Sequence, residues 1–254
     1  MKQALKPNYM KLLTGAAGIL GLSLRAVLYA VGTDQKGLLI EGHWASSGVW
    51  LLTAAIALIL FLWCRQLTGS RNYQKAFPSS LFCAAGAALA GIGFVLSPTA
   101  QAPSPTFANI ELVLRFVSAA SLIWISYCRF RGEKPFFLLH CAVCLYLALR
   151  LVCQYRLWSS DPQIQNYAFY LGAHVALMIT AYQFAAFDAG AGNHKKLWAA
   201  GLSAIYLSTV SLARSDEPFF LICCIVWIWT NLSHPFRKTG NAHSKNQTVQ
   251  EDTP

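Results

Sequence analysis

Long apolar runs alternate with short polar connections along almost the whole chain. Eight runs approach the ~20 residues that a helix needs to cross ~30 Å of hydrocarbon. They cover residues 12–31, 45–64, 78–97, 109–128, 136–155, 166–187, 197–213 and 218–232. Polar and apolar residues do not alternate within them, as they would in the strands of a membrane barrel. The pattern predicts an all-α, polytopic transmembrane bundle of eight helices.

The composition supports this class and excludes several others. Hydrophobic residues make up 56% of the 254 residues, charged residues only 12%, and the mean hydropathy is +0.43. A soluble domain carries about 25% charged residues, so this chain lacks the charge to cover a water-facing surface. The same deficit excludes a disordered chain, and the net charge of +10 is explained by cytoplasmic loops rather than by binding to nucleic acid.

Basic residues in the short connections predict the orientation of the helices. With the N-terminus inside, the cytoplasmic segments carry fourteen Lys and Arg residues, and the opposite connections carry only Lys36, Arg156 and Arg214. We therefore expect both termini to be cytoplasmic. The predicted domains are a transmembrane helical domain over 1–234 and a disordered cytoplasmic tail over 235–254, which is polar throughout.

Two parallel halves of four helices are one possible origin of such a bundle. Asp34 and Asp161 are separated by the same number of residues as Thr53 and Thr180. These are few matches among common residue types, and chance explains them as well as duplication does. The sequence leaves both origins open.

Five charged residues lie within or at the ends of the predicted spans, in the outer third of the membrane. They are Arg25, Glu111, Arg115, Arg150 and Arg214. Charges at this depth are costly and face the bundle interior or a wet cavity. They either form interhelical ion pairs or extend to the interface, or they line an outward-facing cavity whose arginines bind an anionic or zwitterionic ligand.

Glu111 and Arg115 have the i, i+4 spacing of a helical ion pair, with the acid first. We expect Arg25, Arg115 and Arg150 to converge on one polar cluster with Glu111, because three arginines would otherwise repel one another. Further acids are available as partners in the outer connections, namely Asp34, Glu41, Asp161, Asp216 and Glu217.

Metal and haem sites are not predicted. Cys141 and Cys144 share a helix face next to His140, but no second Cys/His pair completes a tetrahedral site. His140 and His174 lie at different depths, so they are not placed to bind a haem between them. The eight cysteines lie within or at the edge of apolar runs, where they are read as small buried hydrophobic residues. No cofactor is expected.

No common catalytic motif is present in the sequence, which lowers the expectation that the chain is an enzyme. Asp188 ends the sixth predicted span in FDAGAGNHKK, near the cytoplasmic face. Its position indicates that it caps the helix or pairs with Lys195 or Lys196. A role in proton relay is the alternative, although no second acid lies within a span at its depth.

Three segments, LRAVLYAVGTDQKGLL, RLWSSDPQIQNYAFYL and AYQFAAFDAGAG, resemble parts of an uncharacterised family of multi-pass membrane proteins from anaerobic Gram-positive bacteria. The resemblance extends over most of the chain. It implies a bacterial plasma-membrane location and no known activity, and it assigns no functional residue.

The function that these features predict is non-enzymatic. The chain is expected to bind or transport a small polar or anionic solute through an outward-facing cavity, with the lipid bilayer as its surroundings and no nucleic acid as a partner. The alternatives are a membrane enzyme that acts on an anionic lipid or lipid-linked headgroup, and a sensor or scaffold subunit. The oligomeric state is left open.

Overall fold

The computed structural model describes residues 7–32, 40, 42–67, 76–77, 80–98, 104–159 and 167–232. Eight α-helices lie within these ranges, and each coincides with one predicted span, so the all-α class is confirmed. They are α1 (Pro7–Val31), α2 (Trp44–Cys64), α4 (Leu81–Leu96), α5 (Pro105–Arg131), α6 (Phe137–Trp158), α7 (Ala168–Asp188), α8 (His194–Ser211) and α9 (Pro218–Asn231), with a short 3-10 helix, η2 (Leu212–Arg214), after α8. The predicted tail over 235–254 lies outside the described residues.

Local signals in the sequence explain where several helices begin and end. The Ser104 hydroxyl accepts a hydrogen bond from the Phe107 amide at 3.5 Å, and Pro105 occupies the first turn of α5. Gly132, at φ 74°, ends the same helix in the left-handed conformation that glycine adopts without strain. The Asn193 side chain caps α8 by accepting from the Lys195 amide at 3.1 Å.

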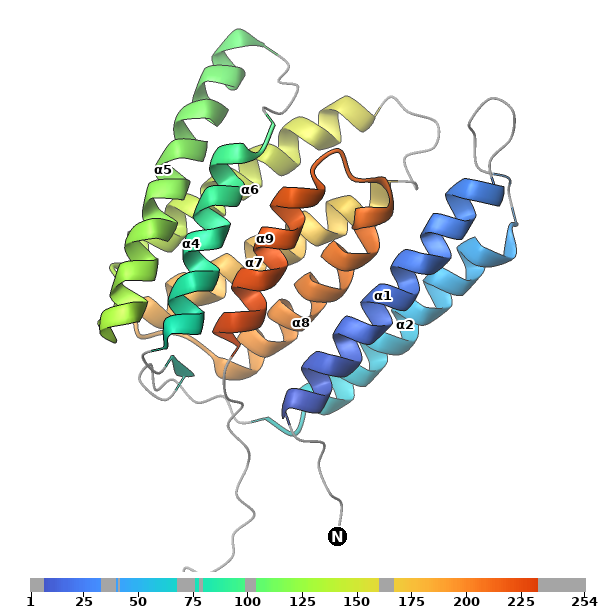
Figure 1. Cartoon of the computed structure of the whole chain (residues 1–254), viewed down its shortest axis with the longest axis horizontal. Coiled ribbons are helices and arrows are strands. Elements are labelled where there is room, and N and C mark those ends of the chain that lie inside the picture. The colour runs from blue at the N-terminus through green and yellow to red at the C-terminus, as the bar shows by residue number, and fades with distance from the viewer. Residues whose placement is uncertain are drawn as a thin grey trace, which may run out of the picture.

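Successive helices run in opposite directions, so the bundle has two ends (Figure 1). The lower end in that view is where α1 begins and α9 ends, and the upper end is where α4 ends and α5 begins. An even number of helices thus brings the described parts of both chain ends to the same side, as the predicted topology requires. Which side of a membrane this is stays a prediction.

Helices that are distant in sequence are neighbours in the bundle. The helix α4 packs between α5 and α9, α7 packs between α6 and α8, and α1 packs against α2 and α8. At the lower end the Lys11 ammonium of α1 donates to the Trp229 carbonyl of α9 at 3.0 Å. A duplication would make the set α1, α2, α4 and α5 equivalent to the set α6, α7, α8 and α9. The two sets are packed differently, because α7 packs closely against α8, the next helix of its set, whereas α2 packs against α1 and against α8 of the other set. This arrangement gives no support to a duplication.

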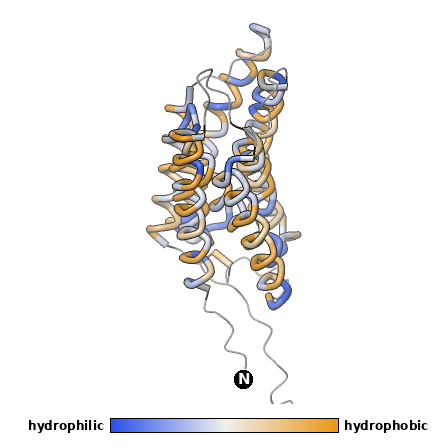
Figure 2. Tube along the Cα trace, turned by 90° about the vertical axis from the view of Figure 1, so that its right-hand side faces the viewer, coloured by the Kyte–Doolittle hydropathy of each residue, from blue (hydrophilic) through white to orange (hydrophobic). Residues whose placement is uncertain are grey.

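The outward-facing surface of the helices is apolar, as a lipid-facing surface must be. Large side chains such as Leu51 and Phe82 are exposed by 72% and 78%. Hydrophobic residues dominate along the helices in Figure 2. Five helices, α1, α2, α5, α6 and α7, are long and apolar enough to cross a membrane, while α4 and α9 are shorter apolar helices. The chain thus has the structure of an integral membrane protein, and the full count of eight spans stays a prediction.

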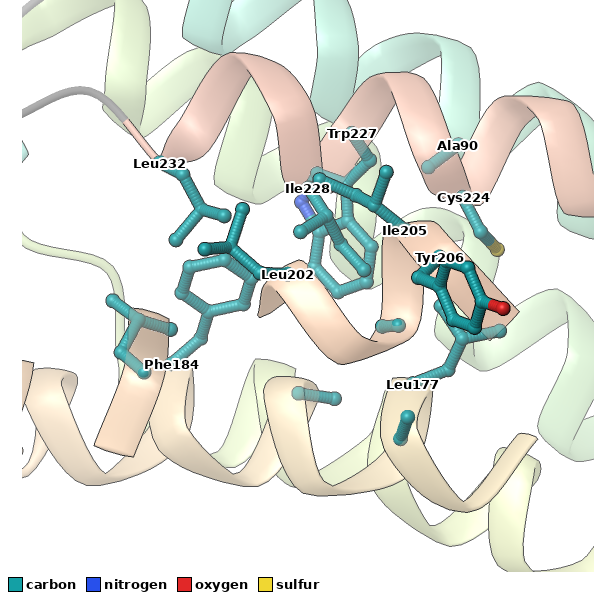
Figure 3. Packing of buried hydrophobic residues seen from close by; sticks show 14 of the residues in the cluster. Ala90, Leu177, Phe184, Leu202, Ile205, Tyr206, Cys224, Trp227, Ile228 and Leu232 are labelled. Carbon is teal, nitrogen blue, oxygen red and sulfur yellow. The ribbon is translucent and has the colours of Figure 1, made fainter. Parts of the chain in front are cut away.

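The core lies where α7, α8 and α9 meet. Leu177 and Phe184 of α7 pack with Leu202 of α8 and with Trp227 and Ile228 of α9, as Figure 3 shows. Because lipid is as apolar as these side chains, their association depends on close packing rather than on escape from water. Trp227 is only 1% exposed, and its ring centroid lies 5.2 Å from that of Phe184.

Glycines bring α4 within close reach of α9. A Cβ atom on Gly93 would lie 2.6 Å from the Cβ of Cys223, and one on Gly86 would overlap the Thr230 side chain. Small residues that let membrane helices approach in this way are typical of their interfaces. The two contacts hold α9 against α4 from Cys223 to Thr230, close to the lower end of the bundle.

We expect Gly93→Ala to lower the free energy of unfolding by about 1–3 kcal/mol, because overpacking here meets a Cβ atom that is fixed to the backbone. The matched control is Gly48→Ala, whose new Cβ would meet Leu24 at an ordinary 3.8 Å. Denaturation of both variants in mixed detergent micelles measures the difference. An equal stability of the two would contradict the close α4–α9 contact.

Candidate polar binding site at the upper end

Arg150 of α6 is the centre of a buried polar network near the upper end. Its side chain is 0% exposed. One terminal nitrogen donates to the Tyr146 hydroxyl and to Glu111 Oε1, the latter at 3.4 Å. The other donates to the Pro98 carbonyl at 3.0 Å and to Glu217 Oε1. One arginine therefore joins α6 to α5, to the end of α4 and to the residue that precedes α9.

Arg115 of α5 enters the same network through Ser97. It donates to the Ser97 carbonyl at 2.6 Å, and the Ser97 hydroxyl donates to Glu217 Oε2 at 3.2 Å. We call this network the Arg150 cluster and define it as Ser97, Glu111, Arg115, Tyr146, Arg150 and Glu217. Four helices meet at it: α4, α5, α6 and α9.

The charges of the Arg150 cluster balance, with two arginines facing two glutamates. Glu111 is fully buried, whereas Arg115 and Glu217 keep 8% and 6% exposure, so the cluster borders the surface of the bundle. Burial raises the pKa of the Glu217 carboxyl, and the neighbouring Arg150 guanidinium acts in the opposite direction. A neutral total lets so many charged groups lie together in an apolar bundle.

A second layer of polar side chains from α6 and α7 adjoins the cluster. Gln154 donates to the Tyr170 hydroxyl at 2.8 Å, and His174 Nδ1 lies 3.1 Å from the Tyr170 carbonyl. Phe220 connects this layer to the cluster, because its ring lies 5.9 Å from the His174 ring and 5.4 Å from the Arg150 guanidinium. Since a carbonyl only accepts, His174 Nδ1 carries the hydrogen and Nε2 is left as an acceptor.

Five buried polar atoms of the cluster and its second layer have no hydrogen-bond partner among the described residues. Two are donors and three are acceptors: Arg115 Nε, Arg150 Nε, Glu111 Oε2, Gln154 Oε1 and His174 Nε2. Buried polar atoms are nearly always paired in folded proteins, and each exception calls for an explanation. Unused donors and acceptors in one place are what a binding site for a polar molecule presents.

The five predicted site residues fall into two groups. Glu111, Arg115 and Arg150 come together in the Arg150 cluster. Arg25 instead donates to the Val210 carbonyl at 3.3 Å and to the Tyr29 hydroxyl at 2.5 Å. Arg214 lies 5.2 Å from the Tyr29 ring, so Arg25 and Arg214 share Tyr29. The expectation that Arg25 joins the cluster is wrong, because α1 packs on α8 and not on α5 or α6.

The predicted ion pair within α5 is also not formed. Among the described residues, no ion pair joins Glu111 to Arg115. Glu111 reaches across to Arg150, whereas Arg115 reaches the end of α4 at Ser97. Glu111 thus pairs with Arg150 of the neighbouring helix and not with Arg115 of its own helix, because the side chains of Glu111 and Arg150 are buried together.

Glu217 was one of several acids available in the outer connections, and the structure identifies it as the second carboxylate on Arg150. Tyr146 and Gln154 were missed. A signal for both exists in the sequence, because Tyr146, Arg150 and Gln154 follow one another at intervals of four residues and therefore share one face of α6. Three polar residues on one face of an otherwise apolar helix mark an interior polar site.

A separate polar pair lies at the lower end. His140 Nδ1 of α6 and Asp188 Oδ2 of α7 are 2.5 Å apart, and both side chains are buried. The expectation that Asp188 pairs with Lys195 or Lys196 is therefore wrong. The connection after α7 turns away through Gly190 at φ 80°, and the amides of both lysines are instead held by Asn193.

The other predicted chemistry is easily placed. All eight cysteines are free thiols, including Cys141 and Cys144. In the part of the chain that the structure describes, no three His, Cys, Asp or Glu side chains are grouped so that they could hold a metal ion. A comparison with known protein families, with curated proteins and with solved structures gave no match.

Proposed function

We propose that this integral membrane protein resides in a bacterial plasma membrane and binds a small polar solute at the Arg150 cluster, with the upper end facing outwards. The observation that carries the proposal is the set of five unpaired, buried donors and acceptors in and beside the cluster. The slight exposure of Arg115 and Glu217 supports access from the upper end. A solute that presents both donors and acceptors would satisfy these atoms.

The charge balance of the site favours a neutral or zwitterionic solute over an anion. Arg150 is already paired with Glu111 and Glu217, so an added anion would give the buried cluster a net negative charge. A zwitterion leaves the total at zero. Its cationic group complements the acceptors Glu111 Oε2, Gln154 Oε1 and His174 Nε2, and its carboxylate complements the free Nε–H groups of the arginines.

Binding, rather than passage through the bundle, is what the arrangement supports. At the edge of the cluster, Phe94 of α4 packs on its member Tyr146 and on Phe220, with ring centroids 5.0 and 5.1 Å apart. Leu147, which is fully buried, extends the same apolar layer. A transporter has broken helices or polar groups at such a level.

We expect a zwitterionic amino acid to raise the melting temperature of the full-length protein in phosphatidylcholine nanodiscs, because a ligand that binds the folded state stabilises it. At a hundred times its Kd the gain is about 2.7 kcal/mol. Glycine, alanine and serine are suitable probes, each compared with inorganic phosphate. Glu111→Gln should abolish the shift by removing the negative charge, and Arg156→Gln, at an exposed position of α6, should retain it.

Each other outcome contradicts the proposal in a recognisable way. A shift with phosphate alone would indicate an anion site. A shift that appears only when the nanodiscs contain anionic lipid would indicate a headgroup site, as the enzyme alternative requires. No shift with any probe would leave the cluster as a set of structural ion pairs.

The orientation has its own test by labelling of single cysteines in a cysteine-free background. We expect the segments 65–77, 129–135 and 189–196 to be cytoplasmic. Within the described residues, the lower end carries Arg65, Arg131 and Lys196, whereas the upper end carries Arg156 and Arg214. Cysteines at Glu133 and Ala191 should react with a membrane-impermeant maleimide only after the cells are opened, whereas one at Ser215 should react in intact cells. Labelling at Glu133 in intact cells would reverse the map.

A further inference from the structure

The buried pair at the lower end has the geometry of a shared proton. His140 Nδ1 and Asp188 Oδ2 lie 2.5 Å apart, and the two side chains are exposed by 1% and 0%. Both groups titrate in water near neutral or mildly acidic pH. A distance this short requires a hydrogen between the nitrogen and the oxygen, because two lone pairs would repel each other.

The second oxygen of the carboxyl group has no such partner. Asp188 Oδ1 is buried without a hydrogen bond to any described residue. A buried carboxyl oxygen without a hydrogen-bond partner is costly. A neutral imidazole and a carboxylate hold one N–H hydrogen between them. Asp188 Oδ1 is a position at which the pair can bind a second one.

Aromatic side chains from α9 and α7 lie next to the His140–Asp188 pair. On the side of α9, the Trp227 ring lies 6.2 Å from the His140 ring in a stacked orientation, and Phe184 of α7 lies 5.4 Å from it. Both aromatic residues are labelled in Figure 3, where they lie in the core formed by α7, α8 and α9. Neither ring titrates.

Charged and titratable groups face the pair from α5. Arg129 interacts electrostatically with His140, and Cys128 interacts electrostatically with Asp188. Beyond α5, Glu133 interacts with Cys128. On α6 itself the nearest thiols in sequence are Cys141 and Cys144, and α8 begins with His194, Lys195 and Lys196.

Asp188 is followed directly by exposed residues at the lower end. Asp188 is the last residue of α7, and the next three residues, 189–191, are exposed. Gly190 turns the chain there with φ 80°. The residue that bears the carboxyl group is thus next in sequence to a water-exposed segment.

We propose that the His140–Asp188 pair is a proton-binding site that exchanges with water at the lower end of the bundle. In the step, one O–H bond of a hydronium ion breaks, the proton forms an O–H bond on the Asp188 carboxylate, and a water molecule is left. The carboxyl group is then uncharged, and the net charge of the pair together with Arg129 rises by one. The proton-binding site is separate from the Arg150 cluster. It lies at the lower ends of α6 and α7, whereas the cluster lies near the upper end of the bundle.

Infrared spectroscopy of the full-length protein in nanodiscs tests the site. We expect lowering the pH from about 9 to about 4 to produce a protonated-carboxyl C=O band that Asp188→Asn removes. The control Asp216→Asn changes an exposed acid of the same type at the upper end and should leave this band unchanged. His140→Gln should shift the midpoint of the band without removing it, because the carboxyl group loses its partner but remains.

The variants also separate a failed fold from a failed proposal. If Asp188→Asn does not fold, the shift of the midpoint in His140→Gln still reports on the pair. A band that Asp188→Asn leaves intact, or a midpoint that His140→Gln does not move, would overturn the proposal.

Discussion

An Arg150→Gln variant is expected to lose about 3–5 kcal/mol of unfolding free energy, which is the usual cost of breaking a buried ion pair from one side. The change leaves Glu111 and Glu217 buried without their shared cation, and it removes donors from Tyr146 and the Pro98 carbonyl. Chemical denaturation in mixed micelles measures the loss.

Two further variants make the result specific to this guanidinium. Arg150→Lys keeps the charge but not the planar fork that spans several acceptors, so an intermediate loss is expected. Arg156→Gln lies further along α6 at an exposed position and should change stability by no more than about 0.5 kcal/mol. If Arg150→Gln were as stable as Arg156→Gln, the cluster would not be holding the upper end together.

Trp227→Ala should cost a similar amount, about 3–5 kcal/mol, because it leaves a large cavity where α7, α8 and α9 meet. Trp227 is 1% exposed and contacts both Phe184 and His140. In an apolar solvent the loss comes from missing packing contacts. The same denaturation experiment measures it.

The matched control is Trp124→Ala, which removes a side chain of the same type from the outer surface of α5, where it is 59% exposed. We expect a change of about 0.5 kcal/mol or less there. Trp227→Phe should fall between the two. Equal losses at both tryptophans would show that position in the bundle does not decide the cost, contrary to the packing described above.

The helices could be predicted from the sequence because an apolar run of sufficient length has few other structures in a membrane. Each predicted span corresponds to a helix, with ends shifted by up to five residues, for example at α1 and α5. The class therefore follows from hydrophobicity alone. The orientation also has a simple physical basis, but it depends on a membrane and awaits the labelling experiment.

The partners of the buried charges could not be predicted in the same way. Depth along a helix follows from the rise per residue, so Glu111, Arg115 and Arg150 were placed at one level. Depth says nothing about which helices are neighbours, and Arg25 lies at a similar depth but on α1, away from them. The pairing of His140 with Asp188 likewise depends on α6 lying against α7. Periodicity identifies the polar face of a helix but not the helix that it meets.

The packing of α1 against α8 has a consequence for the order of assembly. Arg25 donates to the Val210 carbonyl across 185 residues of sequence, and Lys11 reaches Trp229 across 218. At a synthesis rate of about 5–20 residues per second, α1 waits on the order of 10–40 s before its partner on α8 emerges. During that interval Arg25 and Lys11 lack the Val210 and Trp229 carbonyls, whereas Tyr29 of α1 itself is already present for Arg25. The helix α1 thus reaches its final packing only after α8 and α9 have been synthesised.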